Sequence, residues 1–237
     1  MGEIMSVFSR ENQYINLLAQ QPLTVKELAE KLFISEPTVR RDINILKERE
    51  LLTCNKGVVA LKTNSPDKRI PLFIRNLEQN EAKGIIAKKA LTHIKDGYVI
   101  MLDASTTAFH LLPHLVEFKK ILVITNGAKT ALEATSMGMR TICTGGEMTS
   151  ESFSFVGSDA ELVLSRYNAD IAFFSSRGVN ESIASDNSIL ENNIRKVMIK
   201  NSRESYLLCD NSKFGKVYLN TLCRIEDITG VISENED

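Results

Sequence analysis

The sequence predicts a two-part α/β protein, in which a small helical unit with a β-hairpin is followed by a larger unit built on a mostly parallel β-sheet. Three observations predict this fold class. Short amphipathic helical patterns fill the chain before residue 50, a polar stretch follows near residue 62, and apolar strand-like runs then alternate with helical patterns. Apolar strands that are separated by helices are typical of a parallel sheet covered on both faces.

The composition excludes several classes of protein. Of the 237 residues, 43% are hydrophobic. The chain has 29 Lys and Arg and 30 Asp and Glu, so its net charge is -1. Any contact with nucleic acid must therefore come from a local basic cluster. The four cysteines and three histidines show no metal-ligand spacing, and we expect no metal and no cofactor. Neither a membrane span nor a signal peptide is evident, so we expect a cytoplasmic protein with free thiols.

The first unit, residues 1–61, is predicted to begin with three short helices. Apolar side chains recur at helical spacing over residues 12–19, 24–32 and 36–49. Thr24 and Glu27 form a capping-box pattern at the start of the second helix. Ser35 is the expected N-cap of the third helix, and Pro37 falls in its first turn, where the missing N–H costs nothing.

The second and third helices form a helix-turn-helix pattern. The N-terminal end of the second helix in such a motif enters the major groove of DNA, and here it carries short polar side chains and then Arg40 and Arg41. Arginine can donate two hydrogen bonds to a guanine edge or to a phosphate. Strands at 51–53 and 58–61 then flank a turn as a β-wing. An ordinary three-helix bundle with a charged face is the alternative. The predicted DNA-binding residues are Ser35, Glu36, Pro37, Thr38, Arg40, Arg41 and Lys56.

Residues 62–70 are predicted to be a linker, because they are polar, contain a Ser-Pro step and show no periodicity. The second unit, residues 71–237, alternates strands and helices. Its predicted strands cover residues 98–102, 121–124, 140–143, 171–175, 206–209 and 228–232. Its predicted helices cover residues 79–94, 107–115, 128–137, 159–166 and 189–201.

Polar or glycine-containing segments follow four of these strands, at residues 103–107, 125–127, 144–146 and 210–215. Ligands of open parallel sheets bind outside the carboxyl ends of the strands, so these segments are expected to share one crevice. The hydroxyl-rich segment Asp-Ala-Ser-Thr-Thr is suited to hold a phosphate, although an N-cap cluster has the same composition. Lys213 pairs with a phosphate or a sugar hydroxyl, or else is a solvated lysine in a turn.

These segments together resemble the DeoR family of bacterial repressors. The resemblance runs through nearly the whole chain, from VKELA at 25–29 and SEPTVRRD at 35–42 to the Asp-x-Ser-Thr-Thr loop at 103–107 and SKFG at 212–215. It implies a winged helix-turn-helix and a sensor domain with a fold similar to ribose-5-phosphate isomerase. It also implies a phosphorylated sugar effector that releases the repressor from double-stranded operator DNA.

The resemblance also implies a set of effector-binding residues, in which Ser105 to Thr107 hold the phosphate and Lys213 reaches the ligand. The full set is Asp103, Ser105, Thr106, Thr107, Thr125, Asn126, Gly145, Gly146, Glu191 and Lys213. The chain departs from the family in the wing, which lacks a double glycine, and at Ala104, where the family often has glycine. Arg177 is a further departure, and it either adds a donor toward an acidic ligand or faces solvent.

Two-fold operators require at least two reading helices, so we expect a homodimer or a higher homo-oligomer. Two other classes of function stay open. A sugar-phosphate isomerase-like enzyme would need Asp103 or Glu191 as a general base, but no carboxylate-rich loop follows the strand at 171–175, and we expect no enzyme activity. A DNA-binding protein with a purely dimerising second domain would gain no thermal stability from any sugar phosphate.

Overall fold

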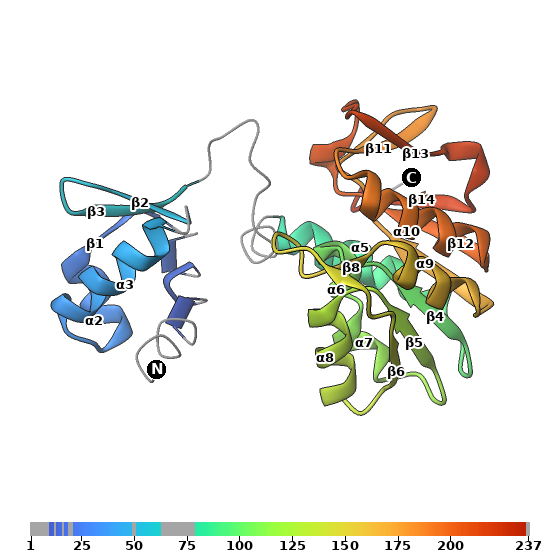
Figure 1. The fold of residues 1–237 in the computed structure, drawn as a ribbon, viewed down its shortest axis with the longest axis horizontal. Helices are drawn as coiled ribbons and strands as arrows, with labels where there is room; N and C mark the ends of the chain where they lie inside the picture. Colours follow the sequence, from blue (N-terminus) through green and yellow to red (C-terminus); the bar gives the residue numbers. More distant parts are fainter. Residues whose placement is uncertain are drawn as a thin grey trace. The chain divides into compact units, whose positions relative to one another are not determined.

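The structure of the chain is a computed structural model, which describes residues 10–11, 13–15, 17–18, 21–48, 51–62 and 79–235 (Figure 1). Contacts divide the chain into two compact units, Met1–Glu78 and Gln79–Asp237. Of the predicted linker only Lys62 is described, and residues 63–70 lie outside the described residues.

The smaller unit contains a helix-turn-helix and a three-stranded antiparallel sheet. Its elements are β1 (Leu23–Thr24), α2 (Val25–Leu32), α3 (Glu36–Glu48), β2 (Leu52–Asn55) and β3 (Val58–Leu61). Residues 10–11, 13–15 and 17–18 are helical and precede them. The capping box at Thr24 and Glu27 is present, with the Glu27 N–H donating to Thr24 Oγ1 at 3.2 Å. The predicted helices and wing are confirmed, and strand β1, which pairs with β3, is an addition.

A buried ion pair holds α3 to the helical segment that precedes it. The Asp42 side chain is fully buried in the middle of α3, and its Oδ2 accepts hydrogen bonds from Arg10 Nε at 2.9 Å and from the Tyr14 hydroxyl at 3.1 Å. Burial, and next the charge of Asp42, raise the pKa of Tyr14, so its hydroxyl stays a donor. Around this pair, Leu28 and Val39 belong to one continuous apolar core.

Helix α2 ends at a residue in the left-handed region. Phe33 has a φ of 56° and a ψ of 39°, and its N–H donates to the carbonyl groups of Ala29 and Glu30. Its side chain is 94% exposed. At the tip of the wing, Lys56 and Gly57 have φ angles of 46° and 81°, as a type I′ hairpin turn requires.

The larger unit is built on a six-stranded parallel sheet in the order β14-β12-β9-β4-β5-β6. The strands are β4 (Val99–Leu102), β5 (Leu122–Thr125), β6 (Arg140–Cys143), β9 (Ala169–Phe174), β12 (Ser202–Leu208) and β14 (Gly230–Ile232). All six correspond to predicted strands, and the parallel pairing is confirmed. The chain adds β5 and β6 on one side of β4 and then crosses to add β9, β12 and β14 on the other, so the strand order reverses between β4 and β9.

Helices cover both faces of this sheet (Figure 1). They are α5 (Asn80–Leu91), α6 (Thr106–Phe109), α7 (Leu112–Leu115), α8 (Ala128–Ser136), α9 (Ser158–Ser165) and α10 (Ile189–Lys200). One core holds α5 to α8 against Ile100 and Leu102, and a second holds α9 and α10 against Met101. Alternate residues of β4 thus serve opposite faces. Among the described residues, no helix is both long and apolar enough to cross a membrane.

The single helix predicted over residues 107–115 is wrong, since two short helices, α6 and α7, occupy this segment. Pro113 lies in the first turn of α7. Proline lacks an N–H and its ring clashes with the carbonyl four residues earlier, here that of Phe109, so a continuous helix cannot form.

Short strands outside the main sheet are not predicted by the sequence. Strands β7 (Glu147–Met148) and β8 (Phe155–Val156) form a hairpin, and β10 (Gly178–Val179), β11 (Ile183–Asp186) and β13 (Asn220–Arg224) form a small sheet. The two-residue strands β7, β8 and β10 are too short to show an alternating pattern, and β11 and β13 mix polar with apolar residues. Gly178 allows a close approach here, because an added Cβ would lie 2.3 Å from the Lys216 carbonyl oxygen.

Replacing Phe33 with glycine is expected to stabilise the smaller unit. A side chain in the left-handed region costs about 1–2 kcal/mol, and glycine returns about 0.5–1 kcal/mol of this through its greater freedom in the unfolded chain. The almost fully exposed ring has little packing to lose. Hydrogen exchange of the α2 amides in the full chain should therefore report a gain of about 0.5–1 kcal/mol for Phe33→Gly. Phe33→Ala keeps the Cβ and should show no such gain, and a loss in the glycine variant would mean that the ring stabilises the unit.

Candidate functional site

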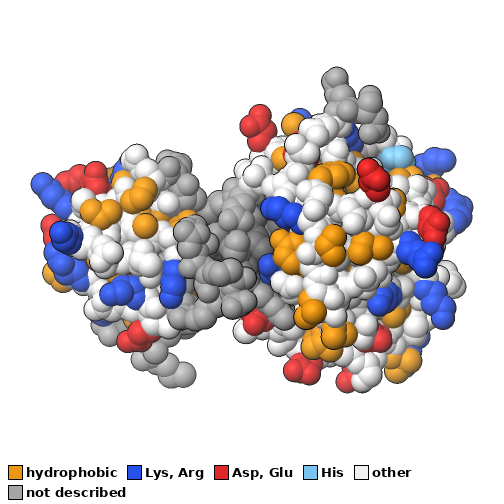
Figure 2. Space-filling view, turned by 90° about the horizontal axis from the view of Figure 1, so that it is seen from above, with side chains coloured by type: hydrophobic (Ala, Val, Ile, Leu, Met, Phe, Trp, Pro, Cys, Tyr) orange, Lys and Arg blue, Asp and Glu red, His pale blue; other side chains and the backbone are white. Residues whose placement is uncertain are grey.

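The reading helix α3 turns one face to the core and the opposite face to solvent. Its buried residues are Val39, Asp42, Ile43 and Leu46. Pro37 and Arg41 are exposed on the opposite face, and Arg40 is exposed to one side, where it pairs with Glu36 at 3.4 Å. Basic side chains are also visible on the surface of this unit (Figure 2). Of the two predicted arginines, Arg41 therefore has the position from which a groove-facing helix contacts bases.

The sequence interpretation misses Asn44. This residue is exposed and lies three residues after Arg41 on the same face of α3. Asparagine can donate to and accept from an adenine edge in the major groove. Its spacing from Arg41 is the signal that identifies it.

The other predicted DNA-binding residues lie at the start of α3 and in the wing. Ser35 and Thr38 share a hydrogen bond of 2.9 Å between their hydroxyl groups, and Thr38 N–H donates to Ser35 Oγ at 3.4 Å. Ser35 thus caps the helix, as the sequence predicts. Lys56 is exposed in the turn between β2 and β3.

In the larger unit, the carboxyl ends of β4 and β9 form the centre of a second candidate site. Asp103 follows β4 and Ser175 follows β9, and the Ser175 N–H donates to Asp103 Oδ2 at 3.1 Å. The strand order reverses between these two neighbouring strands. Open parallel sheets bind their ligands at such a switch point.

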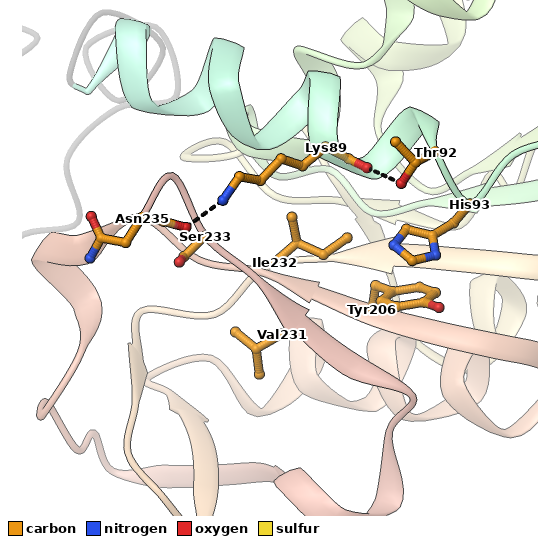
Figure 3. A pocket seen from close by; sticks show the side chains of 8 residues that line it. All are labelled: Lys89, Thr92, His93, Tyr206, Val231, Ile232, Ser233 and Asn235. Atoms are coloured by element: carbon orange, nitrogen blue, oxygen red, sulfur yellow. Dashed lines mark hydrogen bonds between the residues drawn. The ribbon is translucent and has the colours of Figure 1, made fainter. Parts of the chain in front are cut away.

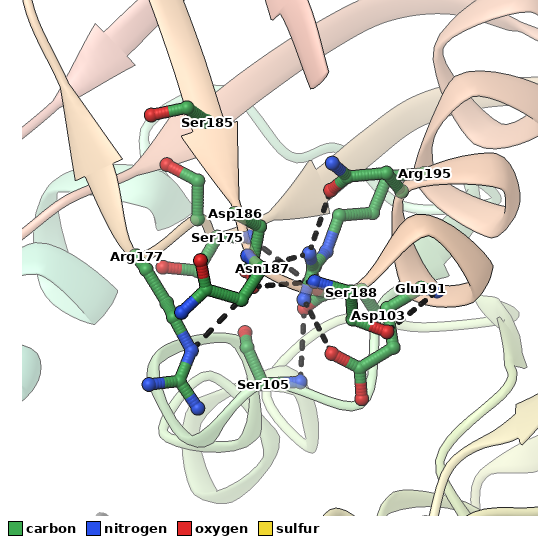
Figure 4. Close-up of polar contacts among 12 residues, drawn as sticks. Asp103, Ser105, Ser175, Arg177, Ser185, Asp186, Asn187, Ser188, Glu191 and Arg195 are labelled. Carbon is green, nitrogen blue, oxygen red and sulfur yellow. Dashed lines mark hydrogen bonds and ion pairs between the residues drawn. The ribbon is translucent and has the colours of Figure 1, made fainter. Parts of the chain in front are cut away.

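A buried guanidinium gathers three carboxylates at this site (Figure 4). Arg195 of α10, whose side chain is 8% exposed, donates from Nε to Asp103 Oδ2 at 2.9 Å and from Nη1 to Asp186 Oδ2 at 3.0 Å. Its Nη2 lies 3.5 Å from Glu191 Oε2. Burial lowers the pKa of Arg195, but the three carboxylates outweigh this effect and hold the pKa above its ordinary value. The guanidinium therefore stays charged and joins three separate segments.

Hydroxyl groups of the β7–β8 hairpin hold Glu191. Its Oε1 accepts from Ser152 Oγ at 2.5 Å and from Ser154 Oγ at 3.0 Å, and Thr149 Oγ1 lies within 2.9 Å of both serine hydroxyls. The predicted residue Glu191 is thus brought to the site with both carboxylate oxygens engaged. The sequence interpretation misses the serines and Thr149, because only the fold brings the hairpin against α10.

Some polar groups of the predicted phosphate-binding loop, residues 103–107, already make hydrogen bonds within the loop and to the start of α6. Ser105 N–H donates to Asp103 Oδ1 at 3.1 Å, and Ser105 Oγ accepts from Ala108 N–H at 3.1 Å as the N-cap of α6. Thr106 and Thr107 are buried, and Thr107 Oγ1 has no hydrogen-bond partner among the described residues. A buried polar atom of this kind is expected to find a partner, so the Thr107 hydroxyl is left unsatisfied within the described part of the chain.

The turn after β5 packs against this loop. Thr125 Oγ1 accepts from Gly127 N–H at 3.0 Å, and a Cβ added to Gly127 would lie 3.1 Å from Ala104 Cα. Asn126 donates from Nδ2 to the Phe155 carbonyl at 3.0 Å, while its Oδ1 is buried and has no partner among the described residues. The segment 125–127 therefore joins the loop at 103–107, as predicted.

Gly145 and Gly146 shape the backbone that leads to the β7–β8 hairpin. Both have positive φ angles, 64° and 107°, and a Cβ on Gly146 would lie 2.9 Å from the Val156 carbonyl oxygen. Glycine is required at Gly146 by this close approach.

Lys213 reaches the same strand ends from the opposite side of β9. It ends the short 3-10 helix η1 (Asn211–Lys213), and its Nζ donates to Ser175 Oγ at 2.8 Å and lies 3.4 Å from Asp210 Oδ2. Burial raises the pKa of Asp210, but the charge of Lys213 and the other surrounding donors outweigh this and lower it. Because Ser175 also binds Asp103, Lys213 is connected to the predicted loop through one residue.

Lys83 is a second lysine near Asp210 that the sequence interpretation misses. It lies in α5, is 4% exposed, and its charge also lowers the pKa of Asp210. The signal in the sequence is its spacing, because Lys83 lies three residues before Ile86 and so falls on the apolar face of α5.

A separate pocket of about 400 Å³ lies between α5 and the strands β12 and β14 (Figure 3). Lys89 Nζ donates to the Asn235 carbonyl there, and the rings of His93 and Tyr206 lie 4.3 Å apart. None of the predicted site residues lines it. Within the described part of the chain, no group of three or more His, Cys, Asp or Glu residues is placed to hold a metal ion.

Two family models match the chain. Residues 10–64 match the DeoR-like helix-turn-helix domain, and residues 78–235 match the DeoR C terminal sensor domain. The first match contains α3 and the wing, and the second contains the whole six-stranded sheet.

Curated relatives are transcriptional regulators. The chain is 34% identical to the HTH-type transcriptional regulator GolR of Listeria innocua over 241 residues, which cover 98% of this chain and 92% of that protein. It is 31% identical to the lactose phosphotransferase system repressor of Staphylococcus aureus over 218 residues, which cover 91% of this chain and 86% of that protein.

Solved structures share parts of the fold. eIF2B delta from Chaetomium thermophilum aligns with a TM-score of 0.50 and 18% identity, over 70% of this chain and 62% of that chain. Ribose 5-phosphate isomerase A from Methanocaldococcus jannaschii aligns with a TM-score of 0.43 and 21% identity, over 58% of this chain and 55% of that chain, too distant a likeness to support an argument about activity. The family models and the curated relatives together establish that the chain belongs to the DeoR family of transcriptional regulators.

Proposed function

We propose that this protein is a repressor of carbohydrate genes that binds operator DNA through α3 and leaves it when a phosphorylated sugar binds at the carboxyl ends of β4 and β9. One observation carries the effector half of the proposal. Two buried polar atoms, Thr107 Oγ1 and Asn126 Oδ1, have no partner among the described residues, and a lysine amine, that of Lys213, is held at the same strand ends. The name of the relative from Staphylococcus aureus, a lactose phosphotransferase system repressor, supports the class of regulated genes.

The chemistry of these atoms suits a phosphorylated sugar. A phosphoryl group has only acceptor oxygens at its charged end, and the Lys213 amine and the hydroxyls of Thr106 and Thr107 are donors. Asn126 Oδ1 is an acceptor, so it requires a donor such as a sugar hydroxyl. The remaining predicted residues are proposed to shape the backbone around the ligand, namely Ser105, Thr125, Gly145 and Gly146.

Asp103 and Glu191 are proposed to position the site rather than to react. Both carboxylates accept hydrogen bonds or ion pairs on both oxygens, and both bind the charged Arg195. A general base must have a lone pair that can reach a substrate proton. These partners argue against the alternative of an isomerase-like enzyme.

The DNA half of the proposal rests on α3, with Arg41 facing the bases and Arg40, Ser35, Glu36, Pro37, Thr38 and Lys56 around it. A two-fold operator would be read by two copies of the chain. Release requires that the sugar phosphate bind the DNA-free arrangement more tightly than the DNA-bound one, since a ligand shifts an equilibrium only by its differential affinity. The units at residues 1–61 and 71–237 would transmit this difference across the linker proposed at 62–70.

Arg41→Ala is expected to weaken binding to promoter DNA from the protein's own locus by about 1–3 kcal/mol, the contribution of a bidentate contact to a base. A mobility-shift titration at fixed salt measures this change. Arg224→Ala is the matched control, because Arg224 is a surface arginine of the larger unit whose side chain is 70% exposed, and its loss also removes one positive charge. Equal affinity of the Arg41 variant and the control would contradict the groove-facing assignment.

Lys213→Ala is expected to leave DNA binding intact and to abolish release of the DNA by sugar phosphates. The amine is the charged donor at the site, and its loss removes a charge-assisted hydrogen bond to the phosphoryl group. The measurement is a mobility-shift assay with a panel of hexose, pentose and triose phosphates, together with their effect on the melting temperature of the full chain. Lys216→Ala, which removes an exposed lysine three residues away, should respond like the wild type. Normal release from the Lys213 variant would place the effector elsewhere.

A further inference from the structure

Arg177 lies at the proposed effector site, two residues after Ser175 at the carboxyl end of β9. Its side chain is 28% exposed, so most of this long cation is enclosed by the protein. The Nε atom lies 3.4 Å from Asp186 Oδ1, which is the one ion pair that Arg177 makes among the described residues (Figure 4).

Asp186 does not require this pairing. Its Oδ2 accepts from Arg195 at 3.0 Å, and its Oδ1 accepts the N–H groups of Asn187 at 2.7 Å and Ser188 at 3.4 Å. A buried carboxylate is stabilised when one cation and further hydrogen bonds satisfy its oxygens, and Asp186 meets this condition through the buried Arg195 alone. Arg177 is therefore surplus to the ion cluster that holds the site together.

The end of the Arg177 side chain is available to a ligand. Its two terminal nitrogens make no hydrogen bond within the described part of the chain, and they point away from Asp186 (Figure 4). A guanidinium carries five N–H donors, of which four are on these terminal nitrogens, in a planar fork that matches a carboxylate or a phosphate. A fork with no partner among the described residues is suited to an anionic group of a ligand.

Two cations, Lys213 and Arg177, lie at the carboxyl end of β9, and each is paired with a different carboxylate. Lys213 reaches it through Ser175 and is paired with Asp210, whereas Arg177 is paired with Asp186. The two are attached to different carboxylates, so each is held in its own place.

We propose that Arg177 binds a second anionic group of the effector, so that the protein selects a phosphorylated sugar that also carries a carboxylate or a second phosphate. The inference rests on the proposed function, in which Lys213 and the loop at 103–107 take the first phosphoryl group. A ligand with an uncharged second end would leave the fork desolvated and unpaired, which weakens its binding. A ligand with an anionic second end accepts charge-assisted hydrogen bonds from the Arg177 guanidinium and therefore binds more tightly.

The test is a calorimetric titration of the full chain with two matched pairs of compounds. Glucitol 6-phosphate and 6-phosphogluconate are both open-chain and differ in a terminal carboxylate, and fructose 6-phosphate and fructose 1,6-bisphosphate differ in a second phosphate. In the wild type, the member with two anionic groups should bind about tenfold or more tightly than its partner in at least one pair. The pair that shows the difference identifies the second group as a carboxylate or a phosphate.

Arg177→Gln keeps a polar side chain and removes the charge. It should reduce that ratio below about threefold and change the affinity for the monophosphate by less than about twofold. Arg177→Lys restores the charge without the fork and should give an intermediate ratio. Arg224→Gln, on the exposed pair with Glu226, should leave all affinities unchanged, and thermal unfolding checks that each variant is folded.

The outcomes separate this inference from the proposed function. Equal affinity within both pairs in the wild type, or an equal loss for both members in Arg177→Gln, would overturn the role of Arg177 while leaving a sugar-phosphate sensor. The second of these results would mean that Arg177 shares the single phosphoryl group with Lys213. No binding of these four compounds or of the wider panel of sugar phosphates would overturn the proposed function, and this inference with it.

Discussion

The larger unit depends on the buried charge of Arg195. Removing a guanidinium from water costs several kcal/mol, and the cost is offset only where opposite charges and hydrogen bonds surround it. Here Asp103, Asp186 and Glu191 provide them, and they come from the end of β4, from β11 and from the start of α10. Asp103 lies 92 residues from Arg195 along the chain, so this one cation joins the loop after β4 to the end of β11 and to α10.

The same ion cluster engages the carboxylates that lie at the carboxyl ends of the strands. Asp103 and Glu191 each bind the permanent cation and also accept further hydrogen bonds, so both carboxylates are held in one orientation. The other polar groups at the strand ends are hydrogen-bond donors, namely the Lys213 amine, the hydroxyls of Thr106 and Thr107, and the guanidinium of Arg177. In the proposed function, this set of donors binds the anionic groups of the effector. The smaller unit uses a similar device, in which the buried Asp42 holds α3 to Arg10 and Tyr14 and leaves the opposite face of the helix exposed.

Local patterns predicted most of the elements and the edge at which the site lies. Helix starts are identified by Thr24 and Glu27 and by Ser35 and Pro37, through interactions within one turn. The six strands are identified by apolar runs, because most of their positions are buried in the sheet. The segments at 103–107 and 125–127 and Lys213 were assigned to one place because the carboxyl ends of parallel strands share an edge. The split of the helix at 107–115 was missed although Pro113 signals it, since the apolar spacing continues across the break.

What the sequence by itself determined is therefore the order of the main-sheet strands, the helix-turn-helix and the polar strand ends, because each depends on residues close together in the chain. Tertiary structure alone decided which distant side chains meet. The pairing of Arg195 with Asp103 spans 92 residues, the hydroxyls of the β7–β8 hairpin reach Glu191 across 37 and 39, and Lys213 meets Ser175 across 38. Charges and hydroxyls have no periodicity that records such partners, and only the packing of helices and loops on the sheet selects them.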